Sequence, residues 1–115
     1  MATIQTFEDV KAWQEAKLLT TEIYKHFKSS KDYSFRDQIQ RASVSIMNNI
    51  AEGFERQTNK ELKQFLYISK GSCGEVRSMV ELAVELKYIT PGDSKKFIEQ
   101  TTTISKMLAG FIKTL

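Results

Sequence analysis

The sequence contains four copies of a short helix-start motif, which constrains the fold more than any other feature. Each copy places a threonine or serine three residues before a carboxylate, at Thr6–Asp9, Ser34–Asp37, Thr58–Glu61 and Thr90–Asp93. In such a capping box the hydroxyl accepts a hydrogen bond from a free N–H of the first turn, and the carboxylate reaches back to the cap. Apolar residues at helical spacing follow each copy, so the sequence predicts four amphipathic helices.

We expect these helices to span residues 7–28, 35–56, 59–87 and 91–115. Pro91 directly follows Thr90 and suits the first helical position, where its missing N–H costs nothing. The linkers are a few polar residues each, and short linkers make consecutive helices antiparallel. The predicted fold class is all-α: a single domain, residues 1–115, forming an antiparallel up-down-up-down four-helix bundle.

The composition bears on the compartment in which the chain works and on the partners it could bind. Cys73 is the only cysteine, so no intrachain disulfide can form, and a reducing cytoplasm is the expected compartment. The N-terminal segment lacks the pattern of a secretory signal, and the longest apolar run, residues 65–68, is far too short to span a membrane. The net charge of +3 is compatible with a nucleic-acid partner but is weak evidence for one.

Each predicted helix has a core stripe. In the third helix, steps of 3, 4 and 4 residues lead from Leu62 through Phe65 and Ser69 to Cys73. This eleven-residue repeat predicts little left-handed supercoiling. The other predicted core residues are Val10, Trp13, Ala16, Ile23, Tyr24, Phe27, Phe35, Ile39, Ala42, Ile46, Ile50, Val76, Val80, Ala83, Phe97, Ile104, Leu108, Phe111 and Leu115.

The second and third helices carry more apolar surface than one core-facing stripe needs. Any of these residues could pack inside the bundle, but large apolar patches mark interfaces, and we favour self-association for the surface as a whole. Gly71 and Gly74, inside the third helix, cost about 1 kcal/mol each relative to alanine. Close approach of another backbone, within the bundle or between subunits, would explain them. The candidate interface residues are Val44, Met47, Ala51, Phe54, Ile68, Met79 and Leu86.

Residues for catalysis are sparse. His26 is the only histidine, it lies on a different predicted helix from Cys73, and no spacing suggests a zinc or di-iron site. No Gly-x-Ser-x-Gly elbow occurs. We therefore expect a protein that is not an enzyme, with no catalytic residue, no metal and no cofactor.

Two polar features remain. Lys63, Lys70 and Arg77 are spaced by sevens and line one edge of the third helix, where they could follow a nucleic-acid backbone. The alternative is a solvated flank with pairs such as Arg77–Glu81. The candidate nucleic-acid-binding residues are Arg56, Lys60, Lys63, Tyr67, Lys70 and Arg77.

The second feature lies on the polar side of the second helix, which carries Arg41, Asn49 and Glu52. We expect a structural network there, with a side-chain amide bonding to another helix or subunit and Glu52 pairing with Arg56.

The chain resembles a known family at several segments. They are Val10–Gln14, Phe35–Ile46, Asn49–Phe54, Phe65–Ser72 and Glu81–Ile89, and the run Ser45-Ile46-x-x-Asn49-Ile50-Ala51-Glu52-Gly53 is the most specific. Together they span essentially the whole chain and are similar to the four-helix-bundle proteins encoded in intervening sequences of bacterial large-subunit ribosomal RNA genes. The resemblance implies a ring-shaped homopentamer and kinship with the accessory protein of diversity-generating retroelements, a basic pentameric barrel that works with a reverse transcriptase and nucleic acid.

The expected function is therefore a non-enzymatic, homo-oligomeric scaffold or adaptor that contacts structured RNA or an RNA-handling protein. The alternative is a pure protein–protein interaction module with no nucleic-acid role. A bundle that binds a ligand in an internal pocket is a third option, which the well-filled core stripes disfavour.

Overall fold

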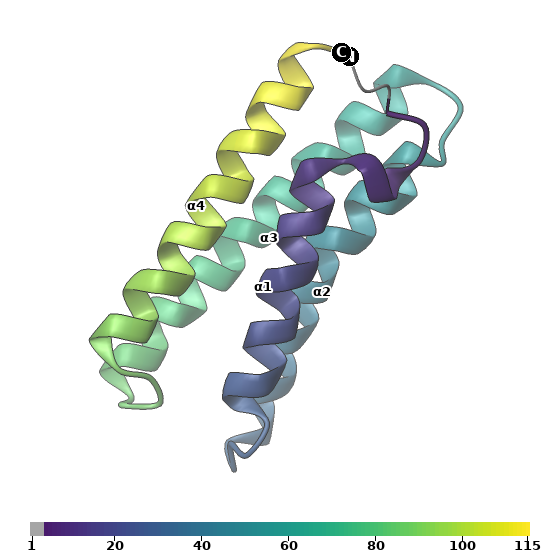
Figure 1. Ribbon diagram of the computed structural model, residues 1–115. Coiled ribbons are helices and arrows are strands. Elements are labelled where there is room, and N and C mark those ends of the chain that lie inside the picture. Colours follow the sequence, from purple (N-terminus) through teal and green to yellow (C-terminus); the bar gives the residue numbers. More distant parts are fainter. Residues whose placement is uncertain (1–3) are drawn as a thin grey trace.

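Four long helices form an antiparallel bundle in the computed structural model, which describes residues 4–115 (Figure 1). Part of the N-terminal segment considered above, residues 1–3, lies outside this range. Each helix packs on its neighbour along the chain, and α4 also contacts α1. The elements are the 3₁₀ turn η1 (Phe7–Asp9) and the helices α1 (Lys11–Phe27), α2 (Tyr33–Phe54), α3 (Asn59–Glu85) and α4 (Pro91–Lys113). The described residues contain no strand, and the all-α bundle is confirmed.

Two predicted helix starts have their expected caps. The Thr58 hydroxyl accepts from the N–H of Glu61 at 3.2 Å, and the Thr90 hydroxyl accepts from the N–H of Asp93 at 3.1 Å. Pro91 is the first residue of α4. Both helices begin where the sequence places them because each cap satisfies an N–H group that the helix itself leaves free.

The start of α2 was predicted wrongly. Its N-cap is Asp32 rather than Ser34, and its carboxylate accepts from the N–H of Phe35 at 3.0 Å. The hydroxyl of Tyr88 donates to the other carboxylate oxygen at 2.7 Å, and together these bonds hold the pKa of Asp32 below its usual value. Aspartate and serine cap helices about equally well, so this contact from the loop between α3 and α4 favours Asp32.

The first helix begins four residues later than predicted. The Asp9 carboxylate accepts from the N–H groups of Gln5 and Thr6, at 3.0 and 3.2 Å, so the predicted capping box is present. It caps only the single turn η1, because Val10 adopts extended backbone angles (φ −76°, ψ 119°) before α1 begins. Val10 is 2% exposed, and this break in the helix places its side chain in the core.

The buried residues of α3 follow steps of 4 and 3 residues, which is a heptad repeat and not the predicted eleven-residue repeat. Leu66 is fully buried where Phe65, only half-buried, was expected. A heptad is the period of left-handed coiled coils, so the expectation of little left-handed supercoiling loses its basis. The repeat consists of Leu62, Leu66, Ser69, Cys73, Val76, Val80 and Ala83.

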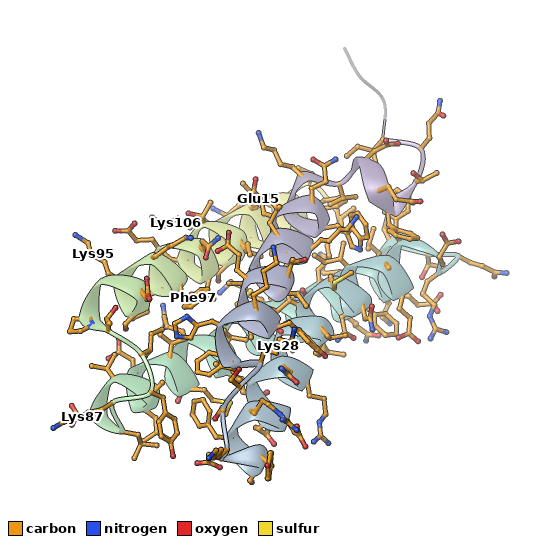
Figure 2. The ribbon with its side chains drawn as sticks, turned by 60° about the horizontal axis from the view of Figure 1, so that its bottom comes forward. Glu15, Lys28, Lys87, Lys95, Phe97 and Lys106 are labelled. Carbon is orange, nitrogen blue, oxygen red and sulfur yellow. The ribbon has the colours of Figure 1, made fainter. Side chains whose placement is uncertain are left out.

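Other core predictions fail by one position at the edge of a stripe. Ile112 is buried in α4, and Phe111 is half-buried beside it. Tyr24 is 44% exposed and is not a core residue. Trp13 and Leu115 are half-buried and pack against the core, whereas Phe97 points from α4 into the bundle (Figure 2). The remaining predicted core residues are all buried.

Of the glycines, Gly53 has the closest neighbours, and it lies where α2 packs on α3. A Cβ atom added at Gly53 would lie 2.7 Å from Cβ of Phe65 and 3.3 Å from the carbonyl oxygen of Leu62. No heavy atom lies within 4 Å of a Cβ added at Gly71 or Gly74, beyond the helix's own local backbone. The prediction that these two glycines permit close packing inside the bundle is therefore wrong.

Candidate nucleic-acid interface

The basic edge of α3 consists of Lys63, Lys70 and Arg77, one residue every two turns. Lys63 and Lys70 are half-buried along their stems, and Arg77 is exposed. None of the three takes part in the four ion pairs found within residues 4–115, so the Arg77–Glu81 pair of the solvated-flank alternative does not form. The basic edge therefore presents three positive charges that no side chain of the described part of the chain neutralises by direct pairing.

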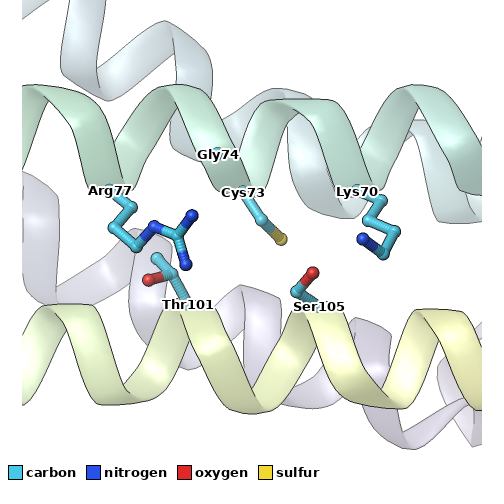
Figure 3. Close-up of a pocket in the computed structure, with 6 residues that line it drawn as sticks. All are labelled: Lys70, Cys73, Gly74, Arg77, Thr101 and Ser105. Carbon is cyan, nitrogen blue, oxygen red and sulfur yellow. The ribbon is translucent and has the colours of Figure 1, made fainter.

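The basic edge borders a groove on one side and the outer flank of α3 on the other. Lys70 and Arg77 line a groove between α3 and α4, with Cys73 between them (Figure 3). Lys60 and Tyr67 lie on the outer flank of α3 by their helical positions, and Tyr67 is 57% exposed. An exposed aromatic ring beside positive charges can stack on an unpaired base, which suits single-stranded segments of RNA.

Arg56 does not join the basic edge. Its guanidinium donates to Oε1 of Glu52 at 2.9 Å, and it lies 4.8 Å above the centre of the Phe65 ring. Phe65 packs against Gly53 of α2, so Arg56 belongs to the α2 side of α3. The predicted Glu52–Arg56 pair is confirmed, but the structure places Arg56 away from the groove that Lys70 and Arg77 share.

The polar network of α2 is more local than predicted. The Asn49 amide donates to the backbone oxygen and to Oγ of Ser45, at 2.8 and 2.9 Å, both on its own helix. Arg41 is exposed. Serines make two of the polar contacts between α2 and α3: Ser45 Oγ lies 2.9 Å from Ser72 Oγ, and Ser69 Oγ donates to the carbonyl oxygen of Ile46 at 2.7 Å. Ser69 and Ser72 thus contribute to helix packing.

The candidate oligomer interface divides into two groups. Ile68 and Leu86 are 52% and 44% exposed on α3 and its C-cap. Sequence reasoning missed Leu82, which is 48% exposed two heptads after Ile68 and was detectable from that spacing. We call Ile68, Leu82 and Leu86 the outer α3 face. The other candidates are half-buried, and several of them pack against the core: Val44, Met47, Ala51, Phe54 and Met79.

The only thiol is buried in the core, and the only histidine lies beside a carboxylate. Cys73 is 2% exposed, and burial raises the pKa of its thiol to about 12. Nδ1 of His26 lies 4.0 Å from a carboxylate oxygen of Asp93, near the C-terminus of α1. Within residues 4–115, no cluster of three or more histidine, cysteine, aspartate or glutamate side chains could hold a metal ion. None of the helices in this range is long and apolar enough to cross a membrane.

These features define a class: small antiparallel four-helix bundles with a basic edge on one helix. Residues 8–110 match the family described as 23S rRNA-intervening sequence protein, and the chain belongs to that family.

A crystal structure at 1.70 Å has the same fold. That protein, from Bacteroides thetaiotaomicron VPI-5482, is described as a member of the S23 ribosomal protein family with unknown function. The two structures superpose with a TM-score of 0.82 over 89% of this chain and 95% of that one, at 24% sequence identity. No curated protein matches the chain.

Proposed function

We propose that this protein is a non-enzymatic, homo-oligomeric scaffold that contacts structured RNA, or a protein that handles RNA, through the basic edge of α3. The observation that carries the proposal is the row of Lys63, Lys70 and Arg77, which no carboxylate of residues 4–115 pairs within 4.0 Å. Seven-residue spacing along a helix puts the Cα atoms of successive basic residues about 10 Å apart, so their long side chains can converge on one phosphate or reach neighbouring phosphates of one backbone.

The outer α3 face supports the homo-oligomeric part. Its three side chains leave about half of their surface in water, at 52%, 48% and 44% exposure for Ile68, Leu82 and Leu86. They recur along one side of α3, where the glycine Gly71 also opens space outside the helix. A second copy of the chain would remove this apolar stripe from water. The family resemblance gives a ring of five as the expected assembly.

RNA binding is expected to weaken as salt rises. Each phosphate contact contributes a slope of about −0.7 to −0.9 in log affinity against log salt, so three contacts give about −2 to −3. Fluorescence anisotropy with a labelled stem-loop RNA, repeated over a range of salt concentrations, measures this slope. Charge reversal by Lys63→Glu with Lys70→Glu should abolish the signal at low salt.

The matched control is Lys95→Glu with Lys106→Glu, two exposed lysines that point away from the bundle on α4 (Figure 2). Both double variants lower the net charge equally, so a general charge effect weakens binding equally in the two. Affinity that does not change with salt, or no binding at low salt, would remove RNA from the proposal. A module that contacts only proteins would then be the better account.

A further inference from the structure

A small groove between α3 and α4 has the composition of an anion site. It has a volume of about 110 Å³ and is lined by Lys70, Cys73, Gly74, Arg77, Thr101 and Ser105 (Figure 3). A single water molecule needs only about 10–15 Å³ of such space, so the groove has room for a small oxyanion. No carboxylate is among the lining residues.

The charge inside the groove is positive and is not compensated. Lys70 and Arg77 stand on either side of Cys73, and both cations act to lower the pKa of its thiol. Burial outweighs them and raises that pKa to about 12, so the thiol between the cations is neutral at physiological pH. The groove therefore holds two positive charges and no negative one.

The α4 wall contributes hydroxyl groups. Thr101 is 1% exposed, and its hydroxyl donates to the carbonyl oxygen of Ile98 at 2.9 Å, which fixes its position. The Ser105 hydroxyl lies opposite Cys73 in Figure 3 and makes no hydrogen bond within the described residues. Ser105 is thus free to donate to a bound oxygen. Donors from two helices can then reach different oxygens of one anion.

We infer that this groove binds a single phosphate group, held between Lys70 and Arg77 with the Ser105 hydroxyl as a third donor. An arginine can meet two phosphate oxygens at once, and a lysine acts as a compact point charge on another. Both a backbone phosphodiester and free phosphate offer several acceptor oxygens to these donors, and free phosphate adds a further negative charge. The phosphate comes either from an RNA backbone, in which case the inference deepens the proposed function, or from free phosphate.

A phosphate titration followed by amide NMR tests the site on the full chain. Inorganic phosphate, added against chloride at constant ionic strength, is expected to shift the amide signals of the six lining residues selectively. Lys70→Gln with Arg77→Gln should weaken this binding by at least about tenfold, since it removes both charge-assisted hydrogen-bond donors of the site. The control, Lys95→Gln with Lys106→Gln, removes the same charge elsewhere on the surface and should weaken it by less than about twofold.

The inference is overturned if phosphate causes no selective shifts, or if the two double variants weaken its binding equally. A single-stranded RNA added to the same three proteins distinguishes the sources of phosphate. If only the groove variant loses RNA binding, the RNA backbone supplies the phosphate. If the groove variant loses phosphate but keeps RNA, the site serves free phosphate, and the proposed RNA contact stands elsewhere. If RNA never binds but phosphate does, the groove inference holds and the proposed function fails.

Discussion

Replacing Leu19 with alanine is expected to lower the free energy of unfolding by about 2–5 kcal/mol, whereas the same change at Leu18 should alter it by less than about 0.5 kcal/mol. The two leucines are neighbours on α1 and differ only in the direction they face. Leu19 is 0% exposed within the core, and Leu18 is 55% exposed. Truncating Leu19 removes apolar burial and leaves a cavity, but truncating Leu18 removes a side chain that is mostly in water.

Chemical denaturation of the two variants measures the difference, provided that the dependence on denaturant stays the same. Equal losses at both positions would mean that α1 is rotated about its axis, so that Leu18 also faces the core. They would also mean that the core stripe of α1 is wrong.

Gly53→Ala is the second large effect, with an expected loss of about 1–3 kcal/mol from overpacking. The new methyl group would lie 2.7 Å from Cβ of Phe65 and 3.1 Å from Cδ1 of Leu62. Leu62 contributes its carbonyl oxygen as well, at 3.3 Å, and a backbone atom cannot move aside without shifting α3 against α2. This outweighs the gain in helix propensity that alanine brings.

Gly110→Ala is the matched control, because it makes the same substitution in a helix where no heavy atom lies within 4 Å of the new Cβ, beyond the helix's own local backbone. There only the propensity gain remains, and we expect a stabilisation of up to about 1 kcal/mol. Thermal unfolding of both variants decides the point. A stabilised Gly53→Ala variant would contradict the close packing of α2 on α3.

The sequence was informative where local chemistry determines the structure. The caps Thr58 and Thr90 follow from residues within one turn, and both are present. At Asp32 and Ser34 two good caps lie two residues apart, and the Tyr88 hydroxyl, 56 residues away along the chain, bonds only one of them. Such a contact depends on how the helices align, and no local pattern reveals it.

Some core positions were predicted wrongly for a similar reason. Phe65 and Leu66 are both apolar and adjacent, as are Phe111 and Ile112, so periodicity alone does not choose which one faces the core. In both pairs the smaller aliphatic residue is buried and the phenylalanine lies at the edge. Ring size alone does not explain this, since Phe27, Phe35 and Phe97 are buried in the same core. The alignment of each helix against its neighbours decides which of the two positions faces inward.

The candidate site could be predicted only in part. The seven-residue spacing of Lys63, Lys70 and Arg77 puts them on one edge of a helix whatever the tertiary fold. That Thr101 and Ser105 complete a groove with two of these cations depends on the alignment of α4 against α3. Neither residue has a distinctive neighbour in sequence, so no motif indicates them.

The mass of the purified protein in solution tests the central claim, a self-associating bundle, most directly. Light scattering at micromolar concentration should give a multiple of the 13.2 kDa chain mass, about five times that value if the family resemblance holds. Leu82→Glu should lower the mass towards that of one chain, because it places a charge in the outer α3 face. Leu18→Glu, at a similarly exposed leucine on α1, should leave the mass unchanged. A wild-type mass of 13.2 kDa at that concentration would contradict the account.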